Sequence, residues 1–210
     1  MPPYQGPPHH VPPQQVPQYP AAPAPYPAAP PPPFPSAPPQ PPPPGPGSGP
    51  AQAYIGAVAQ RLMADQLRIQ HAWVGPVQTM IGIITINPLA SFGSPVEFVL
   101  GVAEVPEVSP MAMDNFPRQL DQFARSQRSL GALGGAMSVA ALVSERVHPA
   151  ALSRLTTRAQ WGSGVLPAIA DLGTRQLHMA TDSPIFGYAM WGKLRKQANR
   201  YLPHPAQVLG

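Results

Sequence analysis

Apolar residues recur at spacings of three and four along the first part of the chain after Pro50, which is the spacing of an amphipathic helix. In segment 51–73 they mark one face, at Ile55, Val58, Leu62 and Ile69. Charged residues lie toward the other side, and the pattern stops at Gly75-Pro76. Because glycine followed by proline punctuates regular structure, we predict a helix over 51–73.

A longer stripe with the same spacings begins near Asn115 and runs to His148-Pro149. Its members are Phe116, Leu120, Phe123, Gln127, Leu130, Gly134, Met137, Ala141 and Ser144. A heptad-like stripe of this length predicts one long helix, of roughly 48 Å for about 32 residues. In its first half Arg118, Arg125 and Arg128 share a helix side, where Asp121 offsets part of their charge.

The second half of this stripe, residues 129–144, has no charged side chain and is rich in glycine and alanine. Gly131 and Gly135 form a GxxxG motif, and Gly134 and Ala141 add further small residues to the stripe. Small residues let another backbone approach closely. The pattern therefore predicts a helix-packing interface made of Gly131, Gly134, Gly135 and Ala141.

The stretch 74–96 also lacks charge, and its middle, 77–86, is rich in β-branched residues between Gly75-Pro76 and Asn87-Pro88. Three interpretations stay open: a buried strand, a buried helix, or a segment inserted in a membrane. Length permits a span, whereas Gln78, Asn87 and the prolines argue against one. The segment 98–102 is expected to form a short strand or to belong to an acidic loop.

Proline punctuates the rest of the chain, which predicts short helices beginning at Pro149, Pro167 and Ser183-Pro184. The last of these is expected to reach about Tyr201 and to carry a basic face made of Lys193, Lys196 and Arg200. Such a face, with aromatic residues at both ends, could bind phosphate groups of lipids or of nucleic acid.

Composition separates a tail from a body. Of the first 50 residues 24 are proline and none is charged, so we expect 1–50 to be a disordered, extended tail. All 13 Lys and Arg and all 9 Asp and Glu lie in residues 51–210. About one body residue in seven is therefore charged, against about 25% in a typical soluble domain. A body so poor in charge is expected to cover surface with a membrane, a partner or another copy.

Catalytic signals are sparse in this chain. There is no cysteine, which excludes disulfides, thiolate metal sites and cysteine nucleophiles. The body histidines His71, His148, His178 and His204 lack partners at metal-ligand spacing, and no nucleophile or phosphate-loop motif is present. We therefore expect no enzyme, no catalytic residue, no cofactor and no metal site. The N-terminus has no evident signal peptide, which leaves a cytoplasmic or a membrane-associated location open.

Together these patterns predict a mostly α fold: a Pro-rich tail over 1–50 and a helical, charge-poor body over 51–210, with a short β element near 77–86 as an option. The predicted function is that of a non-enzymatic structural or interaction protein. It would self-associate, or pack on a partner or membrane, through the Gly/Ala-rich helix face, with the tail as spacer or docking segment. One alternative is a small membrane protein with inserted segments at about 74–96 and 129–144. A second is a nucleic-acid-binding accessory protein that uses the basic C-terminal helix.

Overall fold

The body of the protein is built around a β-sheet, so the predicted mostly α, helical body is wrong. The structure is a computed structural model that describes residues 49–86, 96–127, 135–160, 163–182 and 188–210. All of them belong to the unit Pro44–Gly210. The predicted tail falls almost entirely outside the described residues.

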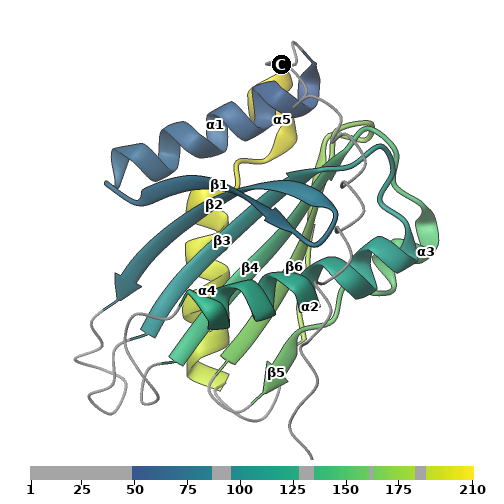
Figure 1. Ribbon diagram of the computed structural model, residues 1–210. Coiled ribbons are helices and arrows are strands. Elements are labelled where there is room, and N and C mark those ends of the chain that lie inside the picture. Colours follow the sequence, from purple (N-terminus) through teal and green to yellow (C-terminus); the bar gives the residue numbers. More distant parts are fainter. Residues whose placement is uncertain (1–48, 87–95, 128–134, 161–162, 183–187) are drawn as a thin grey trace, which may run out of the picture. The chain divides into compact units, whose positions relative to one another are not determined.

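The described strands form one seven-stranded mixed sheet (Figure 1). The strands are β1 (Arg68–Val74), β2 (Val77–Ile86), β3 (Val96–Glu104), β4 (Gly135–Ser144), β5 (Arg158–Gln160), β6 (Ser163–Asp171) and β7 (Gln176–Met179). Their order is β1-β2-β3-β4-β6-β5, and β7 also pairs with β6. The first three strands are an antiparallel meander, whereas β3, β4 and β6 run parallel to one another.

Helices cover both faces of this sheet. They are α1 (Pro50–Ala64), α2 (Pro110–Ser126), α3 (Pro149–Leu152), α4 (Tyr188–Tyr201) and α5 (Pro205–Leu209). One hydrophobic cluster joins α1, α4 and α5 to one face of the sheet, and a second joins α2 and α3 to the other (Figure 1). The sheet is therefore the middle of three layers, as expected for parallel strands that must be covered on both sides.

The predicted long helix is in fact a helix followed by a strand. Helix α2 ends at Ser126, and Gly135–Ser144 is strand β4, so Gly135 and Ala141 do not lie on a helix face. In β4 alternate residues face opposite clusters, with Met137 and Val139 on the α1 side and Ala136 and Ala140 on the α2 side. A strand that is apolar on both faces loses the polar alternation that would identify it, and its residues fit a helical stripe equally well.

The same error affects two other predicted helices. Segment 51–73 contains α1 only to Ala64 and continues into strand β1. The helix expected after Pro167 is strand β6, which carries Pro167 inside it. Three interpretations were open for 77–86, and the buried strand is the correct one, because β2 has these bounds. The predicted strand at 98–102 lies within β3.

Three strand glycines receive large side chains from the covering helices. A methyl group added at Gly101 of β3 would lie 2.6 Å from Cδ1 of Leu120 in α2. Gly82 and Gly164 are covered in the same way, by Leu62 of α1 and by Trp191 of α4 respectively. Each glycine therefore leaves space on the sheet for one large side chain, and that side chain fixes where its helix lies on the sheet.

No helix among the described residues is both long and apolar enough to cross a membrane. Of the two segments considered for insertion, 74–96 contains strand β2 and 129–144 contains strand β4. In β4 every residue from Ala136 to Ser144 is buried. The membrane alternative therefore gains no support from the fold.

Candidate functional site

The residues predicted to form a small-residue helix interface do not form one in the described part of the chain. Gly131 and Gly134 lie outside the described residues. Ala141 is fully buried in β4, where its backbone partners are Val102 of β3 and Ala168 of β6. Ala141 is thus part of the core between two neighbouring strands and is not available to another molecule.

The predicted basic face lies on a helix, as expected, since Lys193, Lys196 and Arg200 are exposed residues of α4. Arg200 is engaged within the body, where it forms an ion pair with Asp65 and lies over the ring of Tyr201 at 5.8 Å. No ion pair of Lys193 or Lys196 occurs among the described residues. Binding of an anionic partner by this face stays a prediction.

The sheet offers a more distinctive feature at its β1 edge. Strand β1 is the first strand in the order and is seven residues long, and among the described strands only β2 pairs with it (Figure 1). The opposite edge is divided, because β6 pairs with the three-residue β5 along its first part and with β7 along its last. Long open edges are templates for pairing with another strand, and proteins usually protect them with proline, lysine or a covering element.

The hairpin that joins β1 to β2 determines which backbone groups of β1 point outward. Val74 pairs with Val77 across the two-residue turn Gly75-Pro76, and Gly75 has the positive φ of 60° that such turns require. The residues flanking a two-residue turn exchange hydrogen bonds, and bonded pairs then alternate along the strands. The backbone N–H and C=O groups of Ile69, His71 and Trp73 therefore point away from β2.

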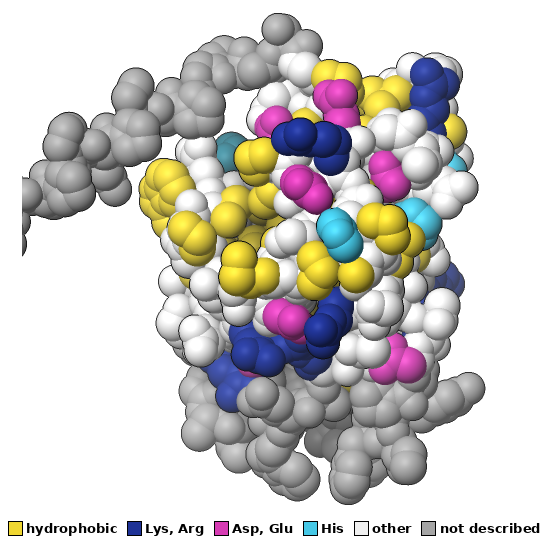
Figure 2. Space-filling model, turned by 90° about the vertical axis from the view of Figure 1, so that its right-hand side faces the viewer, with side chains coloured by type: hydrophobic (Ala, Val, Ile, Leu, Met, Phe, Trp, Pro, Cys, Tyr) yellow, Lys and Arg dark blue, Asp and Glu magenta, His cyan; other side chains and the backbone are white. Residues whose placement is uncertain are grey.

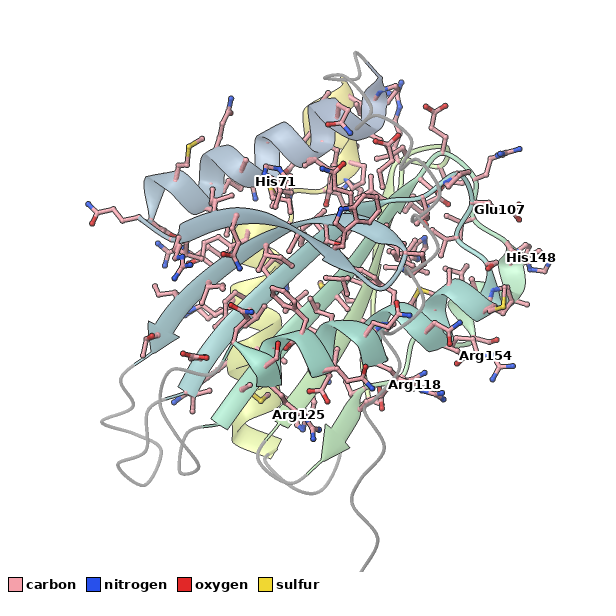
Figure 3. All side chains as sticks on the ribbon, in the orientation of Figure 1. His71, Glu107, Arg118, Arg125, His148 and Arg154 are labelled. Atoms are coloured by element: carbon pink, nitrogen blue, oxygen red, sulfur yellow. The ribbon has the colours of Figure 1, made fainter. Side chains whose placement is uncertain are left out.

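The same three residues place their side chains on the α1 side of the sheet, where Ile69 packs against the α1 cluster. Figure 3 shows the His71 side chain on the side of β1 that faces α1. Trp73 is 58% exposed, which is a large exposure for a tryptophan in a strand. The open edge thus carries an apolar and aromatic surface in addition to unpaired backbone groups. Arg68 is its single charged residue.

Helix α1 is fixed firmly beside this edge. The Tyr54 hydroxyl is buried and donates a hydrogen bond to the Pro203 carbonyl at 2.8 Å. Burial raises the pKa of the Tyr54 phenol above its ordinary value, and the nearby Arg61 opposes this only in part. At the other end of α1, the Arg61 guanidinium donates to the Arg200 carbonyl at 3.2 Å. A rigid helix beside β1 keeps the edge pre-formed.

Strand β1 was hidden in the predicted helix 51–73, and His71 was noted there only as a histidine without partners at metal-ligand spacing. A signal for it was present in the sequence. Two runs that favour strands, 68–74 and 77–86, are separated by only Gly75-Pro76, which is the pattern of a two-residue hairpin. The coincidence of Ile69 with the helical spacing of α1 concealed it.

No group of three or more His, Asp and Glu side chains that could hold a metal ion occurs among the residues that the structure describes. Comparisons of the chain with family models, with curated proteins and with solved structures gave no match. The functional argument therefore depends on the geometry of the body.

Proposed function

We propose that this protein is a non-enzymatic interaction protein that self-associates by pairing β1 with β1 of a second copy. The observation that carries the proposal is the seven-residue open edge, with its unpaired backbone groups and the exposed Trp73. Antiparallel pairing about a two-fold axis would join the two sheets into one. Such closed two-fold dimers are the commonest protein assemblies.

One register suits this strand best, with His71 opposite His71 of the second copy. It uses the outward-pointing groups of Ile69, His71 and Trp73, and it gives about six backbone hydrogen bonds, two for each bonded pair. Ile69 of each copy then lies opposite Trp73 of the other. An aromatic residue opposite a β-branched one is a favourable cross-strand pair.

The charges of β1 are compatible with this register. Its single charged residue, Arg68, lies opposite the uncharged Val74 of the second copy, so like charges do not meet. Trp73 would lose much of its exposed apolar surface, which stabilises association by about 25 cal/mol for each Å² removed from water.

The protein's own Pro-rich segment is a poor occupant of the edge. Of residues 1–50, 24 are proline, and proline has no N–H to donate to a neighbouring strand. Pairing of two bodies would instead bring two such segments into one assembly. Two linked copies of a docking segment bind a multivalent partner more tightly than one copy does.

A charge-swap experiment tests the proposal. His71→Asp and His71→Lys each place like charges opposite one another at the two-fold axis, so each full-length variant is expected to be monomeric. An equimolar mixture places Asp opposite Lys and is expected to restore the dimer. Sedimentation equilibrium measures the masses, and native mass spectrometry of differently tagged copies shows whether the restored dimer is mixed.

The matched control is the same pair of substitutions at His204, which is exposed and makes no side-chain capping hydrogen bond at the start of α5. These variants are expected to associate like the wild type. A monomeric wild-type chain, or dimers that persist in both His71 variants alone, would show that β1 is not the interface.

A further inference from the structure

The charges of the body are divided unequally between the two faces of the sheet. Helices α1 and α4, which cover one face, contain five Lys and Arg and no Asp or Glu. Helix α2, on the other face, contains two Arg and two Asp and is neutral. The chain has a net charge of +4, so outside α1 and α4 it is close to neutral. Figure 2 shows a different side of the body, on which Lys, Arg, Asp and Glu side chains are interspersed.

Both lysines of the chain lie on the outer side of α4. The inward side of this helix is marked by its buried residues, Trp191, Leu194, Ala198 and Tyr201. Lys193 and Lys196 are exposed on the opposite side, and neither forms an ion pair within the described part of the chain. Arg200 is paired with Asp65, and Arg195 donates to backbone carbonyl groups. The two lysines are therefore the charges of α4 that a partner can use.

Helix α1 adds an uncharged surface on the same side of the sheet. Its exposed residues are Gln52, Ala53, Gly56, Gln60, Met63 and Ala64. Met63 is 58% exposed, and the space above Gly56 is open. The exposed side of a surface helix usually carries charged residues, and this one has none. The ion pair between Asp65 and Arg200 joins the C-terminal ends of α1 and α4, so their outer sides adjoin.

We propose that the outer sides of α1 and α4 form a surface that binds the anionic phospholipid headgroups of a membrane. Lys193 and Lys196 attract the headgroup phosphates, and Met63 enters the apolar boundary beneath them. Peripheral binding of this kind uses cationic and apolar side chains together. Trp191 and Tyr201 of α4 are buried and give the bases of a nucleic acid no ring to stack on, which favours lipid as the partner.

Pairing through β1 would double this surface. Residues opposite one another in an antiparallel pair point to the same side, so α1 and α4 of both copies would lie on one side of the joined sheet. Two surfaces facing one flat membrane bind more tightly than one. This doubling rests on the proposed function, whereas binding by a single copy does not.

Cosedimentation of the full-length chain with vesicles tests the surface. One set of vesicles is pure phosphatidylcholine, and the other contains about one quarter phosphatidylserine. Binding is expected only to the anionic vesicles, and it should weaken as salt is added, because salt screens exposed charges. No binding to anionic vesicles, or equal binding to neutral ones, would overturn the proposal.

Matched pairs of substitutions assign the binding to one face. Lys193→Gln with Lys196→Gln is expected to weaken binding to anionic vesicles by about tenfold or more. Arg118→Gln with Arg154→Gln removes the same charge from the α2 side and is expected to leave binding unchanged. An equal loss in both double variants would contradict the assignment. A short DNA duplex that binds more tightly than the vesicles, and only when the lysines are present, would assign the surface to nucleic acid instead.

The role of α1 is tested with a fluorescent label, since the chain has no cysteine of its own. An environment-sensitive dye on Met63→Cys is expected to shift to shorter wavelength with anionic vesicles. The same dye on Gln122→Cys, an exposed position of α2, is expected to show no shift. An unchanged spectrum at position 63 would show that α1 does not enter the membrane.

The His71 variants separate this proposal from pairing through β1. The equimolar mixture of His71→Asp and His71→Lys is expected to bind anionic vesicles more tightly than either variant alone, because only the mixture presents two surfaces. Vesicle binding that is the same in all three samples would contradict the pairing and leave the lipid surface in place. A dimer that ignores anionic vesicles would contradict the lipid surface and leave the pairing in place.

Discussion

The contact between Gly101 and Leu120 positions α2 on the sheet, and its strength can be worked out from the structure. A Cβ atom at position 101 would lie 2.6 Å from Cδ1 and 2.8 Å from Cδ2 of Leu120. Leu120 is fully buried, so its side chain cannot turn aside without meeting other core atoms. Gly101→Ala is therefore expected to lower the free energy of unfolding by about 1–3 kcal/mol, the usual cost of overpacking.

The cost should disappear when Leu120 is shortened. Leu120→Ala alone removes a buried leucine and is expected to cost about 2–5 kcal/mol. In the double variant the methyl group at position 101 occupies space that Leu120 has vacated, so the two costs should not add. The expected coupling free energy is about 1–3 kcal/mol, which a double-mutant cycle in urea measures directly.

The control uses Gly56 in α1, where an added Cβ atom meets nothing within 4 Å. Gly56→Ala is expected to stabilise the helix by up to about 1 kcal/mol, and to do so independently of Leu120→Ala. All measurements use one protein concentration, since association would shift the apparent stability. Costs of Gly101→Ala and Leu120→Ala that add within about 0.5 kcal/mol would refute the proposed contact.

Three further predictions concern the cap of α2, the buried phenol and the open edge. Ser109→Ala removes the side-chain oxygen that accepts a hydrogen bond from the Ala112 N–H (3.2 Å), and it should lower the free energy of unfolding in urea by about 1 kcal/mol. An unchanged urea midpoint would show that the cap is dispensable. Because burial raises the pKa of Tyr54, its contribution to stability is complete below about pH 10 and is lost as pH rises further, by up to about 1.4 kcal/mol per pH unit. Tyr54→Phe should therefore flatten the alkaline part of the stability curve, while an unchanged slope would assign it to other groups. Trp73→Ser, at an exposed site, should change the free energy of unfolding by no more than about 0.5 kcal/mol but should weaken dimerisation in sedimentation experiments. Dimerisation as strong as that of the wild type would argue against the β1 interface.

Part of the cavity between α2 and the strands β5 and β6 could be anticipated from the sequence. The spacing of Arg118 and Arg125 predicted that they share a helix side, with Asp121 opposing their charge, and both arginines line the cavity. Arg158, which lines the same cavity, could not be assigned to it from the sequence. It lies in β5, 33 positions after Arg125 in the chain, and only the pairing of β5 with β6 brings it opposite α2.

The sequence alone determined features whose causes are local. Gly75-Pro76 marks a break in regular structure, the amphipathic pattern after Asn115 marks a helix, and the aromatic and basic residues near the C-terminus mark another. These signals follow from φ preferences and from the contrast between a polar and an apolar helix side. They hold whatever the helix packs against.

Only the tertiary structure decided that 135–144 is a strand. Covered by α4 on one face and by α2 on the other, β4 needs no polar side, and the need for close packing under the helices favours small residues such as Ala136, Ala140 and Ala141. The same small residues, read along the chain, resemble a helix-packing face. The strand is distinguished from such a helix by its hydrogen-bonded neighbours β3 and β6, which the sequence of a single segment cannot reveal.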